Sequence, residues 1–244
     1  MDLNWVEVGD PDSDQVVVFL HEGLGCVEMW KDYPEKLCNQ NNLKGVIYDR
    51  SGYGKSPGSL LNRDKNYLHQ AAEELEYLLN HLTINNPILY GHSDGGSIAL
   101  IHAGQNPGKA KMVITEAAHV FNEAETIQGV KEARPWLKEG KMEGLKKYHG
   151  NRYKEVFYAW NDIWLDPSFK NWDITNLLTN IKVPVLVIQG KNDNYGTLKQ
   201  VNAIVSGVEG AVETLTPDNC GHAPFKEQTA IVMSKASAFI DENK

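Results

Sequence analysis

The stretch ILYGHSDGGSIAL, residues 88–100, runs from a short apolar segment through a serine between glycines into a second apolar segment that favours helix. This pattern predicts a strand that turns sharply into a helix, with Ser93 at the bend. Gly91 and Gly95 are the small residues that let the strand and the helix approach closely enough. The bend would hold the Ser93 hydroxyl over the helix N-terminus, where a nucleophile is useful. The alternative is a glycine-rich structural turn.

A serine hydroxyl is a weak nucleophile near neutral pH, so this hypothesis requires a histidine base and an orienting acid, in the order serine, acid, histidine. The segment VPVLVIQG, residues 183–190, has the pattern of a strand, and Asp193 follows it. The segment NCGHAPF, residues 219–225, places His222 in a loop before the last predicted helix. Of the eight histidines, only His222 combines a position after a late strand, a preceding glycine and the required order. We predict Asp193 as the acid, with Asp218 as its competitor, and His222 as the base.

Acyl transfer through a tetrahedral intermediate also needs an oxyanion hole, in which backbone N–H groups stabilise the developing negative charge. One donor is expected to be the amide of Asp94, directly after the nucleophile. The second should come from the loop after an early strand. The strand pattern QVVVFL at residues 15–20, followed by HEGLG at residues 21–25, has that form. We predict the amide of Gly23 as this second donor.

The motifs, taken together, resemble those of the α/β-hydrolases, and the likeness covers nearly the whole chain. They occur in the family's order: VVVFLHEGLG, DRSGYGKS at residues 49–56, the elbow GHSDGG, the acid in GKND and the histidine in CGHAP. The resemblance implies a mostly parallel central sheet flanked by helices, with a helical cap over the active site. It also implies triad roles for Ser93, Asp193 and His222, and oxyanion donors at the amides of Gly23 and Asp94.

Several charged or polar residues lie in or beside these motifs. The family commonly has glycine where this chain has Glu22, which places a charge near the pocket. Asp94 either caps its helix or receives a substrate ammonium group, since the chain resembles hydrolases of α-amino-acid esters that carry a similar S-D-G-G turn. Glu22 and Asp94 are therefore candidate substrate contacts. Arg50 and Asp49 are expected to pair locally, and His92 to support the elbow.

Short apolar runs alternate with longer helical patterns, as in β-α-β units of a parallel sheet. We expect strands near residues 5–8, 15–20, 44–48, 87–90, 111–116, 183–189 and 211–215, and helices over 67–82, 99–105 and 224–240. About sixty residues between Glu116 and Ile181 lack a convincing strand pattern. The predicted organisation is therefore a core of residues 1–117 and 181–244, interrupted by a helical cap at 118–180.

The predicted cap is rich in aromatic residues and holds four of the six tryptophans. Small-ligand pockets use apolar walls with few polar groups, so Trp160 and Trp164 are candidates to line an acyl or alcohol pocket. The alternative for each tryptophan is packing of the cap against the core.

Length and composition are consistent with one sizeable domain. The chain has 244 residues, 41% of them hydrophobic, and a net charge of -8. This acidic balance argues against nucleic acid or an anionic membrane as a partner. Three cysteines without zinc-site spacing indicate reduced thiols in a cytoplasmic protein. The sequence has no run of about 18 apolar residues that would suggest a membrane span, and the predicted chemistry needs neither a metal nor an organic cofactor.

The reaction expected first is hydrolysis of a carboxylic ester of a small or medium, partly apolar substrate through an acyl-enzyme. The fold hosts many activities, so alternatives stay open. Within enzymes they are an α-amino-acid ester hydrolase that uses Asp94, and a carbon-carbon bond hydrolase or lyase with the same triad. Outside enzymes, the alternative is a ligand receptor that turns over slowly. The sequence leaves the oligomeric state open.

Overall fold

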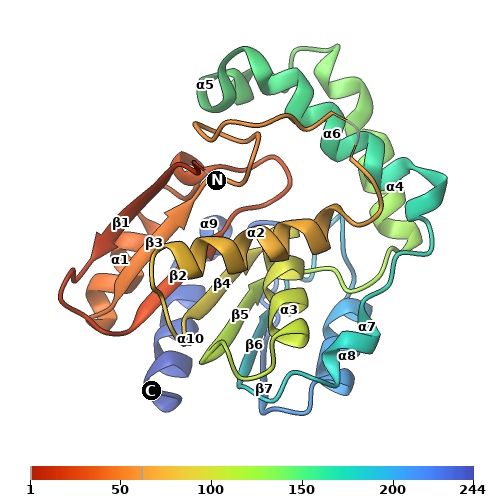
Figure 1. The fold of residues 1–244 in the computed structure, drawn as a ribbon. Coiled ribbons are helices and arrows are strands. Elements are labelled where there is room, and N and C mark those ends of the chain that lie inside the picture. The colour runs from red at the N-terminus through yellow and green to blue at the C-terminus, as the bar shows by residue number, and fades with distance from the viewer. Residues whose placement is uncertain (1, 62) are drawn as a thin grey trace.

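Seven strands form the central sheet in the computed structural model, which describes residues 2–61 and 63–244. Their order across the sheet is β1-β3-β2-β4-β5-β6-β7; β1 runs antiparallel to β3 and every other neighbouring pair is parallel (Figure 1). Each strand corresponds to a segment that the sequence predicts, so the predicted sheet is confirmed. The strands are β1 (Trp5–Gly9), β2 (Val16–Leu20), β3 (Lys44–Tyr48), β4 (Ile88–His92), β5 (Met112–Glu116), β6 (Val185–Ile188) and β7 (Val212–Leu215).

Helices cover both faces of the sheet (Figure 1). Successive side chains of a strand point to opposite faces, so Val18 of β2 packs into one apolar core and Val17 into the other. The first core includes residues of α2 (Tyr67–His81), α3 (Asp94–Gln105), α7 (Thr175–Leu178) and α8 (Leu198–Gly207), and the second includes residues of α1 (Tyr33–Asn41), α9 (Pro224–Glu227) and α10 (Thr229–Glu242). Within the part of the chain that the structure describes, no helix is both long and apolar enough to cross a membrane.

The C-terminal helix differs from its prediction. The sequence predicts one helix over 224–240, whereas the structure has α9 and α10 separated at Gln228, whose φ of -133° and ψ of 44° are not helical. The side chain of Glu227, at the end of α9, accepts backbone N–H groups from the loop before α9. The short α9 is therefore held to that loop and does not simply begin α10. Two further helices, α1 and α8, were not predicted.

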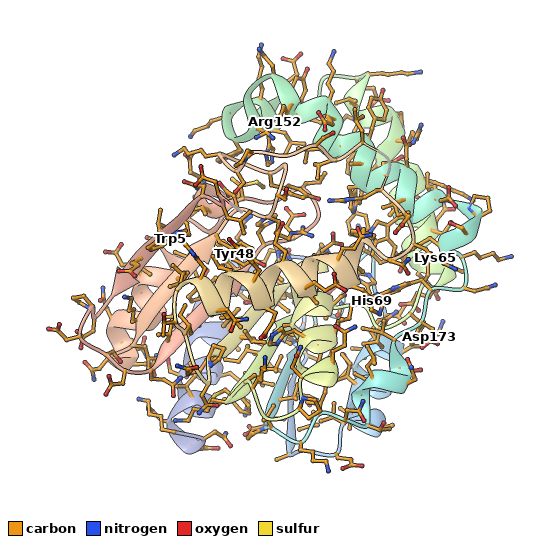
Figure 2. The ribbon with its side chains drawn as sticks, in the orientation of Figure 1. Trp5, Tyr48, Lys65, His69, Arg152 and Asp173 are labelled. Atoms are coloured by element: carbon orange, nitrogen blue, oxygen red, sulfur yellow. The ribbon has the colours of Figure 1, made fainter. Side chains whose placement is uncertain are left out.

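Helices fill the segment between β5 and β6, where the sequence predicts a cap. They are α4 (Ala124–Ala133), η2 (Arg134–Leu137), η3 (Glu143–Leu145), α5 (Lys146–His149), η4 (Gly150–Arg152), α6 (Tyr153–Leu165), η5 (Pro167–Phe169) and α7. Figure 1 shows α4, α5 and α6 beyond one end of the sheet. Arg152, labelled among these helices in Figure 2, donates to the carbonyl oxygens of Gly54 and Ser56 at 2.9 and 3.0 Å. By contrast, α7 packs against α3 and α8 beside the sheet. The division at residues 118 and 180 remains a proposal.

Candidate active site

Ser93 lies in a sharp turn between β4 and α3. Its φ of 53° and ψ of -118° place a non-glycine residue in a strained backbone region. A Cβ atom on Gly91 would lie 2.2 Å from the carbonyl oxygen of Gly95, and one on Gly95 would lie 1.9 Å from the carbonyl oxygen of Leu20. Both glycines are therefore required by close backbone packing. The Ser93 N–H is held by the carbonyl oxygen of Glu116, 2.8 Å away at the end of β5.

The structure brings together the three residues predicted as the triad. The Nε2 atom of His222 lies 2.9 Å from Ser93 Oγ, and its Nδ1 atom lies 2.8 Å from Asp193 Oδ2. Because a carboxylate accepts, Nδ1 is the protonated nitrogen and Nε2 is free to accept the hydroxyl proton. The buried Asp193 also accepts from Gln189 Nε2 at 2.7 Å and from the Tyr195 N–H at 2.8 Å.

These contacts set the charges of the pair formed by Asp193 and His222. Burial alone would raise the pKa of Asp193, but the charge and hydrogen bond of His222 and the N–H of Tyr195 lower it to about 2. Burial alone would lower the pKa of His222, but the carboxylate of Asp193 outweighs the effect of burial and raises the pKa of His222. Glu22 and Asp94 make smaller contributions in the same direction. Asp193 is thus an anion that stabilises the imidazolium expected during proton transfer.

Three side chains fix the loop that carries His222. Glu227 accepts the N–H groups on either side of His222, at 2.6 and 3.0 Å. His92 donates from Nε2 to the carbonyl oxygen of His222 at 2.7 Å, so the residue before Ser93 helps to hold the loop of His222. The buried carboxylate of Glu116 accepts the Phe225 N–H at 2.8 Å. The imidazole is therefore held in place from several directions.

The predicted oxyanion donors occupy neighbouring loops. The carbonyl oxygen of Glu22 accepts from Arg50 Nη2 at 2.9 Å and from His21 Nδ1 at 2.7 Å. The Gly25 N–H donates to the same oxygen at 3.0 Å. In a planar trans peptide the N–H points opposite to the C=O, so these three bonds orient the amide of Gly23. A Cβ on Gly23 would lie 3.3 Å from Asp94 Oδ2, which shows how close the two loops are. The Asp94 amide is the first of α3 and has no acceptor within that helix.

The side chain of Asp94 is buried, and its partners differ from those expected. Its Oδ2 lies 3.5 Å from Arg50 Nη1, and its Oδ1 accepts from the Tyr67 hydroxyl at 3.2 Å. The N-cap position of α3 is Ser93, and no side chain makes a capping hydrogen bond there, so the capping hydrogen bond expected of Asp94 is wrong, although its carboxylate lies in the first turn, where the helix dipole favours it. The expected local pairing of Arg50 with Asp49 is also wrong. Asp49 instead accepts hydrogen bonds from backbone N–H groups and from the Asn4 amide.

A small cavity of about 60 Å³ opens beside Ser93. Glu22, Trp160 and Trp164 line it as the sequence predicts, whereas Asp94 is not among its lining residues. The other lining residues are Leu24, Ser93, His119, Thr126, Val130, Tyr195 and His222. His119 and Tyr195 were not predicted, although they lie in the segments that follow β5 and β6, at the carboxyl ends of the strands where active-site residues of parallel sheets occur. Within residues 2–61 and 63–244, no three His, Cys, Asp or Glu side chains form a group that could hold a metal ion.

Comparison with known proteins agrees with this architecture. Residues 15–174 match the family described as alpha/beta hydrolase fold. The chain belongs to the α/β-hydrolase family. This α/β-hydrolase is similar to the human serine hydrolase BPHL, with 28% identity over 88% of the chain and 75% of the relative. It is also similar to a proline iminopeptidase of Saccharolobus solfataricus, with 26% identity over 94% of the chain and 86% of the relative. Among solved structures, it superposes with a TM-score of 0.78 on MGS-M2, an alpha/beta hydrolase from a deep-sea metagenome, at 22% identity over 100% and 95% of the two chains.

The family match and the relatives' names make this α/β-hydrolase a hydrolytic enzyme. They do not distinguish esters from other substrates, because the relatives include a peptidase.

Proposed function

We propose that this enzyme hydrolyses carboxylic esters through a covalent acyl-enzyme on Ser93. The observation that carries the proposal is the position of His222, whose two ring nitrogens lie 2.9 Å from Ser93 Oγ and 2.8 Å from Asp193 Oδ2. This is the arrangement in which an imidazole removes a serine proton while a carboxylate stabilises the imidazolium.

In the proposed mechanism, Ser93 Oγ attacks the ester carbonyl as its proton moves to His222 Nε2. The amides of Gly23 and Asp94 stabilise the negative oxygen of the tetrahedral intermediate. The His222 imidazolium then protonates the leaving alcohol, and the acyl group remains on Ser93. Water attacks this acyl-enzyme with His222 again as the base, which releases the acid and regenerates the serine.

The size and lining of the cavity favour short substrates. A cavity of about 60 Å³ is well below the roughly 300–1,000 Å³ of pockets for drug-sized ligands. Trp160 and Trp164 contribute apolar surface from α6. We therefore infer esters with short acyl chains, of about two to four carbons, as the best substrates.

A panel of p-nitrophenyl esters with increasing acyl length tests this function. We expect turnover of the short esters and its loss in Ser93→Ala, with wild-type thermal stability as the check that the variant folds. Absence of ester turnover together with cleavage of vinylogous diketones would replace the proposal by a carbon-carbon hydrolase. Tight binding of esters without turnover would replace it by a receptor.

A further inference from the structure

Glu22 places a carboxylate in the wall of the catalytic cavity. It lines the cavity with Ser93 and His222. Its Oε2 accepts the Leu24 N–H at 3.1 Å. Among the described residues, no lysine or arginine side chain lies within ion-pair distance of it. Within residues 2–61 and 63–244, no lysine or arginine therefore pairs with the charge of Glu22.

Asp94, the other carboxylate beside the nucleophile, is in the opposite situation. It is buried, faces the guanidinium of Arg50 and accepts from the Tyr67 hydroxyl. Arg50 contacts Glu22 only at the backbone carbonyl oxygen. The guanidinium of Arg50 thus offsets the charge of Asp94, which does not line the cavity. It forms no ion pair with the carboxylate of Glu22, which does line the cavity.

The neighbours of Glu22 experience its negative charge. Burial and then the charge of Glu22 raise the pKa of Tyr195 to about 12, so this phenol is neutral. The pKa of His222 is raised partly by the same carboxylate. Both neighbours face the cavity. A cation that enters the cavity therefore meets the negative charge of Glu22, with which no lysine or arginine of the described residues pairs.

Aromatic rings surround the same space. Trp160 and Trp164 extend from α6, and the ring of Tyr195 lies 6.0 Å from that of Trp160 and 4.8 Å from that of His222. Aromatic faces attract ammonium groups, and they do so more strongly where water is excluded. A carboxylate with aromatic walls suits a substituted ammonium better than a neutral polar group.

We propose that Glu22 binds a positively charged amino group of the substrate, so that the preferred substrates are small esters with an ammonium group. This inference rests on the proposed ester hydrolysis and names its substrate class. It also assigns the ammonium to Glu22 and not to Asp94. An ionic hydrogen bond of this kind favours the cationic ester by roughly tenfold or more in kcat/KM.

The test compares esters that differ only in charge. The neutral match of the cationic ester butyrylcholine is 3,3-dimethylbutyl butanoate. Methyl butanoate is the neutral match of two further cationic esters, methyl 2-aminobutanoate and methyl 4-aminobutanoate. Hydrolysis is followed by proton NMR near neutral pH in the wild type and in Glu22→Gln, which keeps an oxygen for the Leu24 N–H. We expect at least one ammonium ester to exceed its neutral match about tenfold, and this ratio to fall to about one in Glu22→Gln. Uniform damage to the site cancels in the ratio.

Two further variants test whether the preference for an ammonium ester depends on Glu22 or on another carboxylate. Glu28→Gln removes an exposed carboxylate that pairs with Lys55 outside the cavity, and both rates should stay at wild-type levels. Asp94→Asn should retain the preference for the ammonium ester whatever its effect on the rates. The inference is overturned if no ammonium ester is preferred, if the preference survives in Glu22→Gln, or if it is lost only in Asp94→Asn.

Failure of the inference is separable from failure of the proposed function. Hydrolysis of the neutral esters that depends on Ser93 supports the function, whatever the charge ratio. If no ester is hydrolysed, the function fails, and calorimetry with n-butylammonium and 1-butanol still decides the role of Glu22. Tighter binding of the ammonium in the wild type, lost in Glu22→Gln, supports the ammonium site, and equal binding of the two ligands overturns it.

Discussion

Replacement of Arg50 by methionine tests whether one buried guanidinium organises both predicted oxyanion donors. Methionine keeps an unbranched apolar stem but removes the charge and every donor. The variant loses the ion pair with Asp94 Oδ2, 3.5 Å away, and the 2.9 Å hydrogen bond to the carbonyl oxygen of Glu22. Both Arg50 and Asp94 are buried, with side-chain exposures of 3% and 1%, so water cannot take over these roles.

The structure sets the size of both effects. Removal of one partner of a buried ion pair costs about 3–5 kcal/mol, because the other charge is left uncompensated. For a chain of this length the melting temperature should fall by roughly 6–20 °C. Loss of the Arg50 bond leaves the Glu22 carbonyl oxygen with His21 Nδ1 at 2.7 Å and the Gly25 N–H at 3.0 Å, so the peptide that orients the Gly23 amide loses one of its three hydrogen bonds. Since removal of one oxyanion donor costs ~10²–10³ in kcat, a misoriented Gly23 amide should cost up to that amount.

Thermal unfolding and ester hydrolysis separate the two roles of Arg50. In the double variant Arg50→Met/Asp94→Asn no buried charge remains unpaired, so most of the stability should return while kcat stays low. Arg134→Met is the matched control, because Arg134 is half-exposed and its ion pair with Asp162 lies on the surface. If Arg50→Met melted and turned over like this control, Arg50 would have neither role and the reasoning would be refuted.

Three further outcomes follow from the site. The pKa of His222 is raised, and its neutral form is the base. The kcat/KM for a neutral ester should therefore fall as the pH drops through a pKa above the ordinary histidine value. A pH-rate profile without this acidic fall contradicts the role of His222 as the base. Asp193→Asn removes the carboxylate that accepts from His222 Nδ1, so kcat should fall ~10⁴-fold. The circular dichroism spectrum should stay unchanged. A fall in kcat of less than about tenfold would exclude Asp193 as the orienting acid. Gly95→Ala places a Cβ atom 1.9 Å from the Leu20 carbonyl oxygen, so this variant should lose activity and melt well below wild type. Gly144→Ala is the control, because the space around residue 144 is open, and it should keep wild-type activity and melting temperature.

The strands and the geometry of the triad were accessible from the sequence because both depend on local patterns. Apolar runs bounded by glycine located β4 and β6, and parallel strands bring their carboxyl ends to one edge of a sheet. Ser93, Asp193 and His222 each follow a strand, so their meeting required only that the sheet form. The strained turn at Ser93 was likewise encoded nearby, in Gly91 and Gly95.

The partners of buried charges were not accessible in this way. The pairing of Arg50 with Asp94 joins the loop after β3 to the start of α3, and local spacing favoured Asp49 instead. Glu227 ends α9, and its side chain turns back to the N–H groups around His222. Both contacts are decided by packing after the sheet has formed, and no periodicity records them.

The two carboxylates near Ser93 have different consequences for the chemistry. A negative charge close to the oxyanion hole opposes the charge that develops on the substrate oxygen. The guanidinium of Arg50 offsets this repulsion for Asp94, but Glu22 has no cation among the described residues. A neutral ester must therefore react against the charge of Glu22, whereas an ammonium ester brings the missing cation with it. The advantage of the cationic ester should then increase in the transition state, and it should appear in kcat as well as in KM.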